Sequence, residues 1–161
     1  MLFRSFNGGS HGSYDASFYK YLEVGIQVPF STGTDWMQYD FSRVYVKCET
    51  PISMESWMTG FRAGRSFITN GPLMTFAAGD ASIGDQIDLE APETLTFKAR
   101  VMGRHDFGAA EIVRNGEVIA RVPSRRQGRH FVAEQEHAVA VTESSWFRSE
   151  EHTSELQSPD H

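Results

Sequence analysis

Hydrophobic and polar positions follow one pattern before Pro72 and another after it. In the first part, apolar residues recur at helical spacing between residues 13 and 25, and again from Ser53, a candidate N-cap, to about Gly64. Short apolar or alternating runs at 26–30, 43–47 and 66–69 predict strands before and after the second helix. The first part therefore predicts an alternation of strand and helix.

After Pro72 the pattern changes to short alternating or β-branched runs separated by Gly, Pro and Asp. The dipeptide Asn115-Gly116 is the clearest local signal, because its residues tolerate the positive φ angles of a tight hairpin turn. Regularly spaced runs of this kind favour an antiparallel β-sandwich. The predicted strands are 73–78, 95–102, 111–114, 117–122 and 131–141.

Composition excludes several classes of protein. The chain has 161 residues and is 40% apolar, which is enough for a packed core, and no segment approaches the roughly 20 apolar residues of a transmembrane helix. That absence of a spanning segment makes a membrane an unexpected partner. The formal net charge of −6 provides no overall basic field for phosphate backbones, so nucleic acid is not expected as a partner either. The single cysteine, Cys48, has no second cysteine with which to form an internal disulfide.

Residues 148–161 differ from the rest of the chain. They are rich in Ser and Glu, lack helical or strand periodicity, and are expected to be disordered. Their sequence also resembles the conceptual translation of a short-read sequencing adapter, which places the end of the native sequence at about Phe147. The alternative is a natural acidic tail.

Asp35 is the strongest candidate metal ligand. It follows the apolar run 26–30 and the small residues Ser31 to Thr34, as a carboxylate does when a barrel strand delivers it to a catalytic site. Such a carboxylate can bind a divalent ion, which in turn activates water. The alternative is an aspartate that caps the turn after Gly33.

Three segments carry a resemblance to a known family. The runs 19–35, 43–46 and 62–72 resemble the C-terminal part of CehA/McbA-type metallohydrolases, of the polymerase-and-histidinol-phosphatase (PHP) superfamily. The resemblance implies the last strands and helices of a distorted (β/α) barrel over residues 1–72 and an accessory β-sandwich over 73–147, and it does not extend to the tail at 148–161. It also implies that divalent metals (zinc, manganese or iron) are bound by His, Asp and Glu, with Asp35 among these ligands.

The resemblance also implies a reaction. A parent enzyme of this kind activates water on the metal and cleaves an ester, amide, carbamate or phosphoester bond of a small molecule. Here Met37 occupies the position where the family often carries a second ligand, a histidine, and the family's earlier ligands are not among these residues. The chain is therefore expected to be an inactive C-terminal fragment; a catalytically silent homologue is a further alternative.

Candidate residues on the substrate side are Arg43, Arg65 and Asn70. Guanidinium groups match carboxylate and phosphate geometry, although arginines near helix ends often pair with acids or carbonyls instead. Asn70 ends a predicted strand and is explained equally well as part of an Asn-Gly-Pro turn. His11 and the sandwich histidines are expected at the surface. The rival function is a non-catalytic binding or interaction module built on the sandwich.

Overall fold

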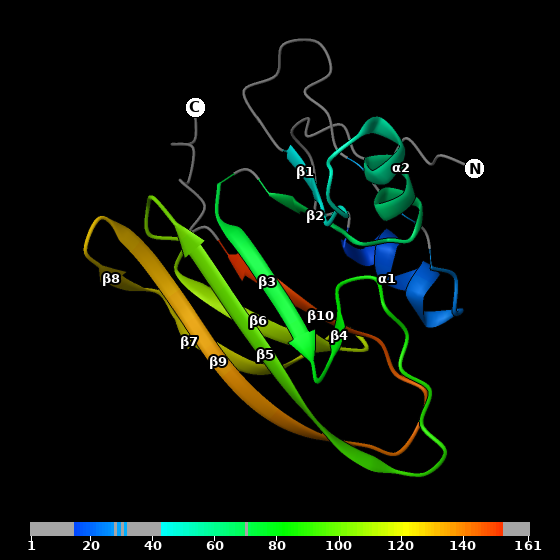
Figure 1. The fold of residues 1–161 in the computed structure, drawn as a ribbon. Helices are drawn as coiled ribbons and strands as arrows, with labels where there is room; N and C mark the ends of the chain where they lie inside the picture. The colour runs from blue at the N-terminus through cyan, green and yellow to red at the C-terminus, as the bar shows by residue number, and fades with distance from the viewer. Residues whose placement is uncertain (1–14, 28, 30, 32–42, 70, 153–161) are drawn as a thin grey trace, which may run out of the picture. The chain divides into compact units, whose positions relative to one another are not determined.

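The computed structural model describes residues 15–27, 29, 31, 43–69 and 71–152 (Figure 1). The described residues fall into two compact units, one within Met1–Asn70 and Asp80–Glu90, the other within Gly71–Gly79 and Ala91–His161. Neither described helix is long and apolar enough to cross a membrane. The elements are α1 (Asp15–Glu23), β1 (Arg43–Val46), α2 (Met54–Arg62), β2 (Ser66–Thr69), β3 (Leu73–Ala78), β4 (Ala81–Ser82), β5 (Glu93–Gly103), β6 (Ala109–Arg114), β7 (Glu117–Pro123), β8 (Arg125–Gln127), β9 (His130–Val141) and β10 (Phe147–His152).

In the first unit, α2 connects two strands that pair with each other. Strands β1 and β2 are antiparallel, with Val44 opposite Ile68. The helix begins at the predicted cap, because the Ser53 hydroxyl accepts a hydrogen bond from the Ser56 amide while the Ser56 hydroxyl accepts one from the Ser53 amide. After the helix, Gly64 has a φ of +72°, which lets the chain turn into β2.

The predicted (β/α) barrel fragment is wrong. Barrel strands are parallel and joined by crossover helices, whereas β1 and β2 are antiparallel and about half of the described chain is strand, with only two helices. The predicted strand at 26–30 is also wrong where it can be examined, since residues 26, 27 and 29 have no strand conformation and positions 28 and 30 lie outside the described residues. Strand and helix periodicity were recognisable, but periodicity does not give the direction in which strands pair.

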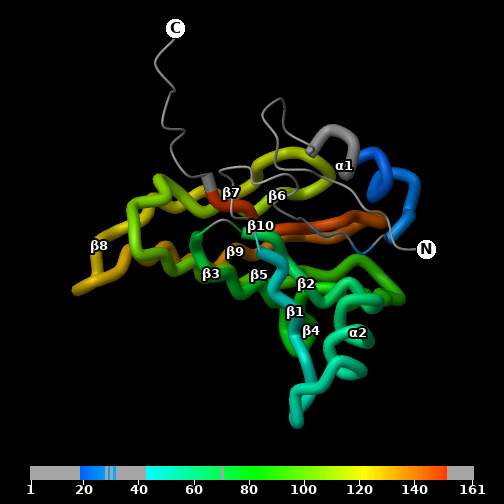
Figure 2. The backbone as a smooth tube through the Cα atoms, turned by 90° about the horizontal axis from the view of Figure 1, so that it is seen from above, coloured from blue at the N-terminus to red at the C-terminus, as the bar shows by residue number. Residues whose placement is uncertain are grey.

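The second unit consists of antiparallel sheets in a sandwich-like arrangement. Strand β6 lies between β10 and β7 in one sheet, while the other has the order β3-β5-β9-β8 (Figure 2). The hairpin between β6 and β7 is the one predicted from Asn115-Gly116, whose φ angles are 49° and 86°. Two positive φ values are what a two-residue turn requires to match the twist of its strands.

The sandwich core follows from alternation along its long strands. In β5, Phe97, Ala99 and Val101 are buried while the residues between them are exposed. Phe97 stacks on Phe147 of the opposite sheet, with ring centroids 4.2 Å apart, and on Phe76 of the neighbouring strand at 5.6 Å. The aromatic stack therefore joins the two sheets through their inward faces.

The predicted disorder of residues 148–161 is wrong for residues 148–152. Strand β10 pairs with β6 from Phe147 opposite Arg114 to His152 opposite Ala109. The prediction rested on side-chain composition, but ladder hydrogen bonds use backbone groups and tolerate a polar sequence beside an open edge. Residues 153–161 lie outside the described part, and the adapter resemblance stays a prediction.

Candidate functional site

Only some of the predicted site residues belong to the described chain. Asp35 and Asn70 lie outside the described residues, as does Met37. Arg43 opens β1 opposite Thr69, whereas Arg65 lies before β2, next to the Ser66–Val46 pair. The two arginines are therefore at opposite ends of one ladder, and the structure does not bring them together.

Arg65 lines a groove in the first unit. The groove has a volume of about 250 Å³ and lies between the end of β1, the first turns of α2 and the residue preceding β2. It contains two cationic side chains and two carboxylates, together with hydroxyl groups from the helix. Its lining includes Lys47, Glu49, Ser53, Glu55, Thr59 and Arg65.

Close backbone packing holds α2 against the end of β1. A Cβ atom at Gly60 would lie 2.5 Å from the Lys47 carbonyl oxygen and 2.9 Å from a Val46 methyl group. Only a residue without a side chain permits this approach. Beside it, the Lys47 amide donates to the Arg65 carbonyl at 2.8 Å, so the backbones that carry the two cations are hydrogen-bonded to each other.

The segment 80–90 supports both cations of the groove. Arg65 Nε lies 3.4 Å from Asp85 Oδ1, and Lys47 Nζ donates to Ser82 Oγ at 2.8 Å. The Ser82 amide in turn donates to Asp85 Oδ2 at 2.9 Å. The pKa of Asp85 is lowered, chiefly by this backbone hydrogen bond and then by the charge of Arg65, so the carboxylate stays ionised in neutral solution.

Sequence reasoning missed Lys47, Ser82 and Asp85. The three-residue spacing of Ser82 and Asp85 is typical of a local side-chain to backbone hydrogen bond, and that signal was available. Nothing in the local pattern connected this turn with Lys47 or Arg65, because the contacts span 35 residues for Lys47 and Ser82.

The described residues do not assemble a metal centre. Among them, no group of three or more His, Cys, Asp or Glu side chains converges. His105 and His130 are exposed, as expected for surface histidines, and His137 is half-buried on β9. Because Asp35 lies outside this part of the chain, its metal role stays a prediction.

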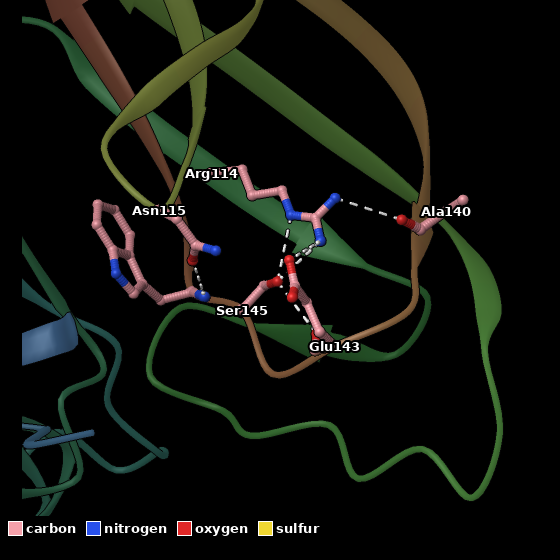
Figure 3. A network of polar contacts seen from close by, with 6 residues as sticks. Arg114, Asn115, Ala140, Glu143 and Ser145 are labelled. Atoms are coloured by element: carbon pink, nitrogen blue, oxygen red, sulfur yellow. Dashed lines mark hydrogen bonds and ion pairs between the residues drawn. The ribbon is translucent and has the colours of Figure 1, made fainter. Parts of the chain in front are cut away.

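A second polar cluster, centred on Arg114, lies in the sandwich (Figure 3). Its Nε and Nη2 donate to Ser145 Oγ at 3.2 and 3.0 Å, and Nη1 donates to the Ala140 carbonyl at 3.4 Å. The guanidinium carbon also lies 5.8 Å from the centre of the Phe147 ring. These contacts fix the connection between β9 and β10, which is a structural role.

Comparison with protein-family models, with curated proteins and with solved structures finds no match to this chain.

Proposed function

We propose that the chain is part of a metal-dependent hydrolase and that its first unit provides the substrate side of the site. The substrate is a small molecule with an ester, amide, carbamate or phosphoester bond. The observation that carries the proposal is the groove containing Lys47 and Arg65, because Arg65 belongs to the 62–72 run on which the family resemblance chiefly depends.

The chemistry of the groove suits a polar substrate with one oxyanion or polarised carbonyl. The contact with Asp85 uses Nε of Arg65, which leaves the terminal nitrogens of that guanidinium for a second acceptor. Lys47 adds a compact charge, while Glu49 and Glu55 balance the two cations. A balanced groove favours a substrate of low net charge over a multiply charged one.

The metal requires ligands beyond the described residues. Asp35 is the ligand that the resemblance implies, and the bound ion would supply an activated water. Since the described residues hold no metal-binding group, no catalytic step is assigned to them. Lys47 and Arg65 are given the role of binding and orienting the substrate.

The test uses the protein expressed from its complete reading frame. Metal content is measured after loading with zinc or manganese, for the wild type, Asp35→Asn and a matched Asp80→Asn control at an exposed turn. The proposal expects metal loss in Asp35→Asn alone, and hydrolysis of p-nitrophenyl acetate or of the singly charged diester bis(p-nitrophenyl) phosphate that a chelator abolishes. Equal metal content in the three proteins would remove Asp35 as a ligand.

A binding module is the second candidate. It is favoured by the second unit, in which Phe97 and Ile112 join two antiparallel sheets around a core of that unit's own residues. If the protein expressed from the complete reading frame binds neither zinc nor manganese, the binding module is favoured over the hydrolase.

A further inference from the structure

The β8–β9 hairpin concentrates positive charge in an otherwise acidic chain. Residues 118–133 contain four arginines and no aspartate or glutamate, although the whole chain has a net charge of −6. One of these arginines, Arg121, is paired with Glu111 at 3.3 Å. The other three, Arg125, Arg126 and Arg129, are exposed.

The sheet adds a fourth arginine to this end. Arg126 on β8 and Gly103 on β5 are both opposite Phe131 of β9, so Arg104, the next residue, lies about two strand spacings from β8, roughly 10 Å away. Arg104 is exposed. The basic patch is defined as Arg104, Arg125, Arg126 and Arg129.

None of these four arginines forms an ion pair with another described residue. Arg126 Nε donates weakly to the Gly128 carbonyl at 3.4 Å. The nearest acid in sequence, Asp106, is occupied by the Gly108 amide at 2.9 Å and by the Ser124 hydroxyl. The patch therefore presents guanidinium groups that can form charge-assisted, bidentate hydrogen bonds to an external oxyanion.

The hairpin fixes the backbone that carries the patch, and Arg125 and Arg126, as successive strand residues, extend to the two sides of the β8 edge. Gln127 and His130 pair across a two-residue loop in which Gly128 has a φ of +62°. This tight hairpin fixes the backbone positions from which the side chains of Arg126 and Arg129 extend. Strand β8 has only β9 as a neighbour in its sheet, so its other edge is open within the described residues. Figure 1 shows β8 at the tip of this hairpin.

We propose that the basic patch binds a short acidic peptide segment of a partner protein through its aspartate or glutamate carboxylates. The size of the patch supports this choice, because a span of roughly 10 Å accommodates about three extended residues. Beyond the patch, the next cations along the sheet, Lys98 and Arg100, are each paired with an acid, Glu136 and Glu134, so the unpaired positive charge does not continue along the surface as a longer polyanion such as a nucleic acid strand would require. This inference does not depend on the proposed hydrolase.

The test is fluorescence anisotropy with a labelled short peptide of alternating glutamate and glycine. The wild type is compared with Arg125→Ala/Arg126→Ala/Arg129→Ala and with a control, Lys20→Ala/Arg62→Ala/Lys98→Ala, which removes three exposed cations elsewhere. We expect the patch variant to bind at least about tenfold more weakly and the control to stay within about twofold. Wild-type binding should also weaken when salt is raised from about 50 to 200 mM.

Several results would overturn the proposal. If the peptide affinity falls equally in both triple variants, the binding depends on net charge and not on the patch. If the wild type does not bind the peptide, the proposed site does not exist. If the wild type binds a single-stranded oligonucleotide of equal charge more tightly than the peptide, the ligand of the patch is a nucleic acid and not an acidic peptide. If the patch variant only self-associates in size-exclusion chromatography while its peptide affinity is unchanged, the arginines merely protect an open sheet edge.

Discussion

The Arg65 guanidinium lies 3.4 Å from the Asp85 carboxylate and joins the start of β2 to the segment 80–90. The same carboxylate accepts the Ser82 amide hydrogen bond, so one side chain both closes a local turn and holds a cation of the groove. The groove is therefore shaped by a segment that enters the first unit from later in the sequence.

Replacing Asp85 should reveal this contribution through its pH dependence. At pH 7, Asp85→Asn should lower the free energy of unfolding by about 1 kcal/mol, since the substitution removes an exposed ion pair and weakens one hydrogen bond. Because the pKa of Asp85 is lower in the folded state, this stabilisation is complete above the unfolded value of about 3.9. It is lost as pH falls through the folded pKa.

Urea denaturation at neutral and acid pH checks the prediction. The free energies of unfolding of the wild type and Asp85→Asn should differ at pH 7. They should converge at acid pH, where the Asp85 carboxyl group of the wild type is protonated in both its folded and its unfolded state. Asp80→Asn, at an exposed turn position, should match the wild type throughout. A gap of the same size at both pH values would contradict the electrostatic explanation.

Gly84 should tolerate no side chain. Its φ is +87°, and a Cβ atom there would lie 2.6 Å from the Gly64 carbonyl carbon and 2.7 Å from the Arg65 amide nitrogen. Backbone atoms cannot move aside cheaply, so Gly84→Ala should destabilise the first unit by about 3 kcal/mol or more. Thermal unfolding followed by circular dichroism measures the loss.

The matched control is Gly79→Ala. Gly79 also has a positive φ, +57°, but nothing lies within 4 Å of its added Cβ. This variant should lose only about 1 kcal/mol from backbone strain. Equal losses at the two positions would show that the close approach of Gly84 to Gly64 has no energetic importance.

Phe97 should dominate the sandwich core. It is 4% exposed and stacks on rings from both sheets, so Phe97→Ala should cost about 3–5 kcal/mol. Phe97→Leu keeps most of the volume and should cost roughly half as much. Denaturant unfolding of the two variants tests this order, and a loss below about 1 kcal/mol for alanine would refute the assigned core.

Arg114 should matter more than a typical arginine of the sandwich. Its guanidinium reaches Ser145 and the Ala140 carbonyl, so Arg114→Lys should lose about 1–2 kcal/mol, because one ammonium group cannot reproduce the fork. Arg100→Ala is the control: its contact with Glu134 is 3.9 Å long and exposed, and it should cost under about 0.5 kcal/mol. Chemical denaturation that ranks the two variants in the reverse order would exclude the structural role of Arg114.

The sequence by itself determined the local features of this protein. Ser53 begins α2 and Asn115-Gly116 turns β6 into β7, because a cap and a tight turn each depend on backbone angles and hydrogen bonds within a few residues. Alternation likewise located β5 and β9, whose inward faces form the core.

Tertiary structure alone decided the pairing directions and the groove. Helix α2 was recognisable, but whether β1 and β2 ran parallel depended on how the chain packed after it, and the barrel prediction failed there. The contact of Arg65 with Asp85 and the pairing of β10 with β6 join residues distant in sequence. No local pattern encodes such partners, because they are selected by the free energy of the whole packed chain.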